Sequence, residues 1–203
     1  TTGLRGLAYW QIEVTGANRD LHSGHFGGAV ANPINVLCKL IADVIDENGR
    51  ITIPHFYDDV EEVPAAEREM IAAIPFDEEA YKQGLGVEAL QGEKGYSTLE
   101  RNSCRPSFDV CGIWGGYTDE GAKTVIPSKA YAKVSTRLVP HQQHEKISQL
   151  FIDYIKEVAP RSVKVEVTPL HGGEGYVCPI TIPAYRAAED GFTQAFCKRP
   201  LAV

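Results

Sequence analysis

The chain has 203 residues, of which 43% are hydrophobic and 23% charged, and its formal net charge is -7 at pH 7. This length allows one sizeable domain with a hydrophobic core, or one domain and part of another. The acidic balance, without a basic patch, argues against binding to nucleic acid. No apolar run is long enough to span a membrane, and the first residues lack the pattern of a signal peptide.

The cysteines are odd in number and scattered, and no two of them form a CxxC pair. We therefore expect neither a disulfide framework nor a cysteine zinc site, and a reducing, cytoplasmic setting fits best. The chain opens at Thr1 and stops at Val203, where a new apolar segment begins, so we expect a fragment of a longer protein. The five cysteines are Cys38, Cys104, Cys111, Cys178 and Cys197.

In chain order, the first predicted element is a strand at residues 9–15, where apolar and polar residues alternate. A polar, glycine-rich loop follows this strand. Asn32 and Pro33 then start a helix, because asparagine is a good N-cap and proline suits the first turn. Its apolar residues recur at helical spacing until Asn48 and Gly49.

Residues from about 50 to 107 break this pattern and are interpreted as an insertion. They contain one predicted helix at 64–74 and an irregular, glycine-rich stretch at 84–96. Loops longer than about 15 residues are usually functional or disordered. The aromatic residues Phe56 and Tyr57 argue against disorder here.

Regular patterns return with predicted strands at 108–114 and 129–138, a helix at 142–158 and a strand at 163–168. The helix is the clearest element, because its apolar residues all fall on one face. In the strand at 129–138, alternate positions form an apolar face, and Arg137 is not among them. We therefore expect Arg137 to point away from the core.

Apart from the insertion, the predicted order is strand, helix, strand, strand, helix, strand. This order predicts an α+β fold of the ferredoxin-like, split βαβ type, in which a four-stranded antiparallel sheet carries two helices on one face. The other face of the sheet is then free. A tail at residues 176–203, with a predicted helix at 183–198, has little left to pack on and is expected to belong to another domain.

Reactive side chains are densest in the stretch Asp20-Leu21-His22-Ser23-Gly24-His25-Phe26-Gly27-Gly28. Glycine allows positive φ and close approach of the backbone, and imidazole exchanges protons near neutral pH. A polar loop with two exposed histidines explains these residues equally well. The pair His22-x-x-His25 could bind a metal, but no third clustered ligand accompanies it.

Further motifs are Asn32-Pro33, Phe56-Tyr57-Asp58, Gly112-Ile113-Trp114-Gly115-Gly116-Tyr117, Gly121-Ala122-Lys123-Thr124-Val125-Ile126-Pro127, Arg137-Leu138-Val139-Pro140 and His171-Gly172-Gly173. With the histidine stretch, they closely resemble the dinuclear zinc peptidases of the carnosinase, carboxypeptidase-G and ArgE–DapE type. The order and the spacing of the motifs also resemble that family. The set covers residues 4 to about 200 and is highly specific, although each motif alone is weak.

In that family, a catalytic α/β domain holds two zinc ions, and an inserted lid or dimerisation domain has the split βαβ fold. The resemblance identifies residues 4–175 with the lid and residues 176–203 with the start of the returning catalytic domain. The zinc ligands and the general-base glutamate belong to motifs that match no residue here. The resemblance therefore implies two zinc ions in the full-length enzyme, but no metal and no hydrolytic activity in this chain alone.

The resemblance also implies roles for single residues in a homodimeric enzyme that hydrolyses dipeptides or N-acyl amino acids. His22 would reach into the active site of the partner subunit and stabilise the oxyanion of the tetrahedral intermediate. Thr124 and Arg137 would hold the substrate's carboxylate, which a guanidinium can bind bidentately. His55 stands where relatives often have glycine, and Cys111 where a polar residue is common, which leaves substrate preference open.

Two other interpretations remain open. Because the split βαβ fold hosts many functions, the chain could be a free-standing sensor of amino acids or a purely structural dimerisation module. Each site residue also has an ordinary structural explanation: a surface ion pair for Arg137, a strand-end hydroxyl for Thr124 and an exposed loop position for His25. A sensor should bind a free amino acid without metal, and a lid fragment should not.

Overall fold

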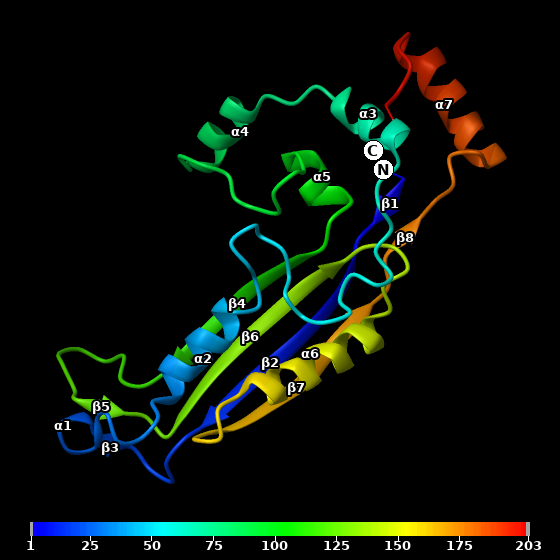
Figure 1. Cartoon of the computed structure of the whole chain (residues 1–203). Coiled ribbons are helices and arrows are strands. Elements are labelled where there is room, and N and C mark those ends of the chain that lie inside the picture. The colour runs from blue at the N-terminus through cyan, green and yellow to red at the C-terminus, as the bar shows by residue number, and fades with distance from the viewer. Residues whose placement is uncertain (1, 202–203) are drawn as a thin grey trace.

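The structure, a computed structural model, describes residues 2–201. Its centre is a four-stranded antiparallel sheet with the strand order β4-β6-β2-β7 (Figure 1). Together with the helices that cover it, this sheet makes the fold mixed α+β, as predicted. The four strands are β2 (Gly6–Thr15), β4 (Ser107–Gly115), β6 (Lys129–Leu138) and β7 (Lys164–Gly173).

All four predicted strands are confirmed, and β6 has the predicted bounds. In β2 the side chains are alternately buried and half-buried, because every second one faces the helices. β7 is longer than the predicted strand at 163–168. It continues past a bulge beside Tyr9 and Trp10, so that His171 pairs with Tyr9 and Gly173 with Leu7.

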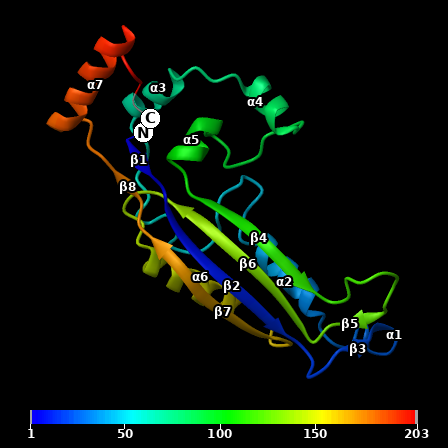
Figure 2. The same cartoon turned by 180° about the vertical axis from the view of Figure 1, so that it is seen from behind.

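Two helices, α2 (Pro33–Ala42) and α6 (His144–Val158), lie on the same face of the sheet (Figures 1 and 2). The expected cap of α2 is present: Oδ1 of Asn32 accepts a hydrogen bond from the amide of Ile34 at 2.9 Å. Among residues 2–201, no helix lies against the opposite face of the sheet (Figures 1 and 2). The sheet therefore has one core face and one open face.

The helix α2 ends at Ala42, several residues before the predicted end. The chain leaves the helix because it reverses and pairs Ile45 with Ile51 in an isolated β-bridge. Val44, which suggested a longer helix, is fully buried in the core without being helical. The apolar residues therefore continue beyond the end of the helix because they are buried in the core, not because they are helical.

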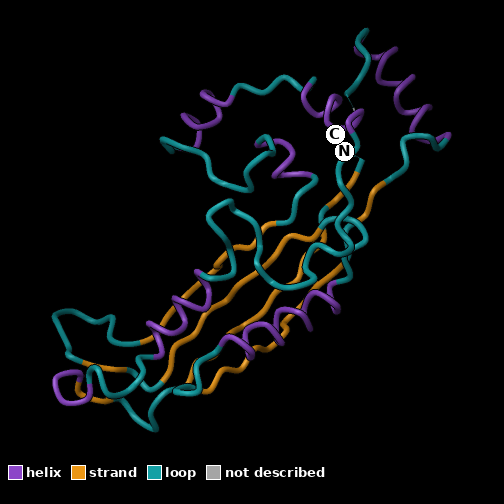
Figure 3. The backbone as a smooth tube through the Cα atoms, in the orientation of Figure 1, coloured by secondary structure: helices purple, strands orange, loops and turns teal. Residues whose placement is uncertain are grey.

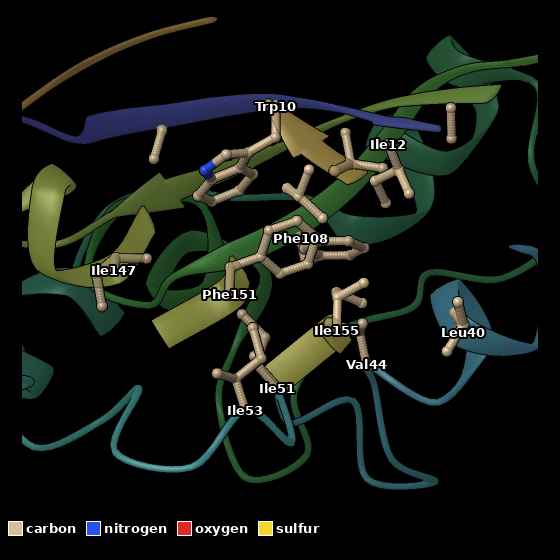
Figure 4. Packing of buried hydrophobic residues seen from close by; sticks show 14 of the residues in the cluster. Trp10, Ile12, Leu40, Val44, Ile51, Ile53, Phe108, Ile147, Phe151 and Ile155 are labelled. Carbon is tan, nitrogen blue, oxygen red and sulfur yellow. The ribbon is translucent and has the colours of Figure 1, made fainter. Parts of the chain in front are cut away.

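The hydrophobic core lies between the sheet and the two helices (Figure 4). The ring of Trp10 in β2 packs on that of Phe151 in α6, with centroids 4.5 Å apart, and Phe108 of β4 lies 5.8 Å from Phe151. All three side chains are buried. Each contributes about 1.5–3 kcal/mol or more by leaving water, so this aromatic group fixes α6 on the sheet.

The insertion between α2 and β4 contains more regular structure than predicted (Figure 3). The predicted first helix is confirmed, but two further helices were missed. The last one begins with a capping box, in which the side chains of Ser97 and Glu100 each bond to the other residue's backbone. The three helices are α3 (Ala65–Ala72), α4 (Glu78–Leu85) and α5 (Thr98–Ser103).

Two small pairs of strands lie at opposite ends of the main sheet (Figure 1). At one end, β3 (Leu21–His22) pairs with β5 (Val125–Ile126), and the short helix α1 (Ser23–Phe26) follows β3. At the other end, β1 (Gly3–Leu4) pairs with β8 (Tyr176–Val177). The chain therefore enters and leaves this domain side by side.

The predicted C-terminal helix is present as α7 (Pro183–Phe196), beyond β8. None of its residues is buried, and it lies away from the main sheet (Figure 2). Within residues 2–201, we find no helix with the length and apolar character needed to cross a membrane.

Candidate functional site

His22 lies where the small sheet of β3 and β5 meets the helix α1. It pairs with Val125 in that sheet, and the amide of Ser23 donates to the carbonyl of Thr124 at 3.1 Å. These contacts bring His22 beside Thr124, although the two residues are 102 positions apart in the chain. The structure thus brings together two of the three site residues expected from the sequence.

Two hydrogen bonds hold the imidazole of His22. Its Nδ1 accepts from the amide of Gly24 at 3.0 Å and so caps α1, and its Nε2 lies 3.1 Å from Oγ1 of Thr124. Because a backbone amide can only donate, Nδ1 is the acceptor and the proton of the neutral ring is on Nε2. Nε2 is therefore the donor atom of His22, and the Thr124 hydroxyl keeps its own proton for another acceptor.

Neighbouring residues fix the loop around His22. Oδ1 of Asp20 accepts from the amide of Ser128 at 2.8 Å and from its hydroxyl at 2.9 Å. Both bonds lower the pKa of the Asp20 carboxyl, and the bond from the Ser128 amide has the larger effect. At Gly24 a Cβ would lie only 2.8 Å from Cε1 of the His22 ring, so glycine is required for the ring to take this position.

His25 lies beside His22, with ring centroids 5.0 Å apart, and is exposed. Within residues 2–201, a group of three metal-capable side chains occurs elsewhere, at the start of α6. There, Nε2 of His144 is 3.2 Å from Glu145 and 3.9 Å from Glu174. One imidazole and two exposed carboxylates at a helix N-terminus do not fit a centre for two zinc ions.

The two unusual residues of the motifs have local explanations. His55 has φ 63°, in the left-handed region that favours glycine, which accounts for the glycine expected there. Its Nδ1 lies 2.9 Å from the carboxylate of Asp58. Cys111 lies in the bulge of β4, and its Sγ is 3.3 Å from Oγ of Ser135.

Arg137 lies on the open face of β6, between Leu7 of β2 and Ser107 of β4, and is exposed as predicted. From Lys129 to Arg137 the strand extends roughly 25 Å, at about 3.3 Å per residue. His22 lies beyond the Lys129 end of β6 (Figure 1). The structure therefore separates Arg137 from His22 and Thr124 by the length of the sheet.

The sequence interpretation missed Arg5 and gave no role to His171. His171 stacks on Tyr9 of β2, with ring centroids 5.0 Å apart. Arg5 is two residues before Leu7, which is the strand partner of Arg137. The pKa of Arg5 is lowered mainly by burial and, to a smaller extent, by the positive charge of Arg137. No alternation marks Arg5, which precedes β2, and the position of His171 depends on the register of β7 against β2.

The four-stranded sheet, the two helices on one of its faces and the loop that contains His22 together define the class of protein. The family described as the peptidase dimerisation domain of the M20 type matches residues 2–163. The chain belongs to this family, as the motifs indicated.

Relatives of this chain are metallodipeptidases. It is 35% identical to the Cys-Gly metallodipeptidase DUG1 of Candida albicans over 182 residues. This aligned region covers 87% of this chain and 37% of that protein. It is 32% identical over 205 residues to the human Beta-Ala-His dipeptidase, with 98% and 40% covered. The solved structure of the di-peptidase Dug1p from Saccharomyces cerevisiae matches with a TM-score of 0.82 at 29% identity, over 99% of this chain and 43% of that one. The chain thus spans about two fifths of the length of these curated relatives.

Proposed function

We propose that this chain is the lid and dimerisation domain of a zinc-dependent peptidase or amidohydrolase that cleaves dipeptides or N-acyl amino acids. Its relatives include a Cys-Gly and a Beta-Ala-His dipeptidase, which supports a small substrate with an amide bond and a free carboxylate. The described residues offer no ligand set for two zinc ions. We therefore place the metal centre outside this chain and expect the chain alone to be inactive.

The observation that carries the proposal is the separation of the site residues along the sheet. A dipeptide is only about 7 Å long, whereas β6 alone extends roughly 25 Å between Lys129 and Arg137. One substrate molecule therefore cannot contact both His22 and Arg137 of the same chain. The two residues can act on one substrate if they come from the two chains of a homodimer.

Pairing of β4 with a second copy is the dimer contact that we propose. In the main sheet β4 is an edge strand bonded to β6 alone, and it exposes Val110, Ile113 and Trp114. An unpaired edge of this kind is a template for another strand. Antiparallel pairing about a two-fold axis places the Gly115 end of one β4 beside the Ser107 end of the other.

This arrangement supports a site shared between the subunits. Gly115 leads into the segment that contains Thr124, which is hydrogen-bonded to His22. Ser107, at the other end of β4, pairs with Arg137. The His22 loop of one chain would therefore lie on the same side of the dimer as Arg137 of the partner subunit.

At the shared site, each residue has a distinct task. When substrate binds, the Nε2–H of His22 turns from Oγ1 of Thr124 to the oxyanion that develops on the scissile carbonyl. The Thr124 hydroxyl, with its own proton available, and the Arg137 guanidinium hold the substrate's carboxylate, the latter through two parallel hydrogen bonds. The oxyanion exists only in the transition state, whereas the carboxylate is also held in the ground state.

The strand order and the position of the two covering helices support the finer assignment of the fold as ferredoxin-like. We assign residues 4–175 to the lid, with the insertion at about 50–107, and residues 176–203 to the start of the returning catalytic domain. The pairing of β1 with β8 supports this boundary, because both connections leave the lid at one place.

Light scattering on the chain tests the proposed contact. We expect a dimer at high protein concentration and a monomer after Ile113→Lys, which puts a charge on the proposed contact. Leu170→Lys is the matched control, since Leu170 lies on the other edge strand and is 46% exposed, against 48% for Ile113. A wild-type monomer at high concentration, or a dimer that survives Ile113→Lys, would contradict the proposal.

A further inference from the structure

A cavity of about 470 Å³ lies beside Arg137, where the insertion meets the main sheet. Its volume is in the range of small-molecule sites, about 300–1,000 Å³. The wall is built from Arg5 just before β2, from residues 45–51, from part of α5 with the segments before and after it, from the start of β4 and from the end of β6. The charged residues of the wall are Arg5, Glu93, Arg101, Arg105, Asp109 and Arg137.

The acidic residues of the cavity do not neutralise its arginines. Glu93 is occupied by Arg105, which donates two hydrogen bonds of 2.7 Å to its carboxylate. Asp109, the second acid in the wall, accepts a hydrogen bond from the Ser107 hydroxyl at 2.9 Å, and its charge raises the pKa of Arg5, against the larger lowering by burial and Arg137. Within the described part of the chain, neither Arg5 nor Arg137 forms an ion pair of 4.0 Å or less. The cavity therefore has an excess of positive charge.

Two guanidinium groups have donors that the protein does not use. Arg105 is 1% exposed, and its Nη1 is buried without a hydrogen-bond partner among residues 2–201. This atom is closed to solvent, and the guanidinium lies over the ring of Tyr96, with its Cζ 4.3 Å from the ring centroid, so Arg105 does not offer this donor to the cavity. Arg5 uses Nη1 for the carbonyls of Arg101 and Arg105, both at 3.3 Å, and its Nε and Nη2 remain for a ligand.

Arg5 and Arg137 lie close together on the open face. Leu7 of β2 pairs with Arg137, and Arg5 precedes Leu7 by two residues, just outside β2, so the chain brings Arg5 near Arg137. The charge of Arg137 contributes to lowering the pKa of Arg5. An anion placed between two like charges stabilises both of them.

We propose that this cavity binds the side-chain carboxylate of substrates whose C-terminal residue is acidic. This inference rests on the proposed function, in which Arg137 holds the C-terminal carboxylate itself. Arg5 then holds the second carboxylate through charge-assisted hydrogen bonds from its Nε and Nη2. The pair Arg5 and Arg137 thus makes the site selective for dicarboxylates.

The test is an NMR titration of the 203-residue chain with glutarate, with butyrate as a monocarboxylate of similar length, and with inorganic phosphate. Glutarate should bind about tenfold more tightly than butyrate. Arg5→Gln should remove this advantage and leave butyrate binding unchanged, whereas Arg137→Gln should weaken both. Arg161→Gln, an exposed arginine outside the cavity, should change neither.

A second variant guards against misfolding, because Arg5 also bonds to two backbone carbonyls. Arg5→Lys keeps the charge but lacks the planar fork, and it should retain only part of the glutarate advantage in a chain whose circular dichroism is unchanged. Equal affinities for glutarate and butyrate, or an advantage that survives Arg5→Gln, overturn the inference. Phosphate binding as tight as glutarate binding overturns it too. Butyrate binding that is insensitive to Arg137→Gln instead contradicts the role of Arg137 in the proposed function.

Discussion

Replacing His22 with alanine in the intact enzyme should affect catalysis far more than stability. The imidazole makes two hydrogen bonds, one at Nδ1 with the amide of Gly24 and one at Nε2 with Thr124. Loss of the first removes the cap of α1, which costs about 1 kcal/mol or less, because this helix has four residues and none of them is buried. Loss of the oxyanion donor at Nε2 should lower kcat by about 10²- to 10³-fold.

Two variants separate these effects in steady-state kinetics and urea denaturation. His22→Asn places a side-chain oxygen where it can cap α1, but its shorter amide does not reach the position of Nε2. This variant should therefore recover the stability and not kcat. His25→Ala, which removes the exposed neighbouring ring, is the matched control and should leave kcat unchanged.

If His22→Ala lowers stability and leaves kcat unchanged, the residue is only a helix cap. If His22→Asn restores kcat as well as stability, the loss in the alanine variant comes from the loop conformation and not from a missing donor.

Arg137→Ala should raise KM most for substrates with a free carboxylate, because this charge is held in the ground state as well; an equal effect on amidated substrates would argue against the carboxylate role. Arg105→Met should lower the free energy of unfolding by about 3 kcal/mol or less, because the buried Glu93 keeps only Arg50, at 3.2 Å, as a charged partner. Lys39→Met removes a surface pair and should cost at most about 1 kcal/mol in the same urea titration. The hydrogen bonds from Ser128 lower the pKa of Asp20, so they stabilise the loop above the unfolded pKa of about 3.9, and this contribution is lost as the pH falls through the lower folded value. The NMR protection factor of the Ser128 amide, which compares its exchange rate with the intrinsic rate at the same pH, should fall on acidification, and in Asp20→Asn it should lack this pH dependence.

Periodicity predicted the main sheet and its helices because each of these elements has one face in the core. The alternation at 129–138 gave both the bounds of β6 and the outward position of Arg137. The same reasoning extended α2 too far, because Val44 is buried without being helical. Helices α4 and α5 were missed, since they bury little apolar surface and depend on caps such as the pair Ser97 and Glu100.

The candidate site was only partly predictable, because tertiary pairing builds it. Nothing in the local sequence indicates that His22 and Thr124 are hydrogen-bonded across β3 and β5. The motifs identified both residues only through their resemblance to a family. Arg5 was missed because it precedes the alternating part of β2, and its position beside Arg137 depends on the register of two strands.

The central claim is that two chains share each active site, and mixing two defective forms of the intact enzyme tests it most directly. A dimer of one His22→Ala chain and one Arg137→Ala chain has one site with both residues intact and one with neither, if the residues act across the dimer. The account predicts that co-refolding the two variants restores activity well above the sum of their separate activities. Activity that stays at that sum would show that His22 and Arg137 act within one chain, or not on the same substrate.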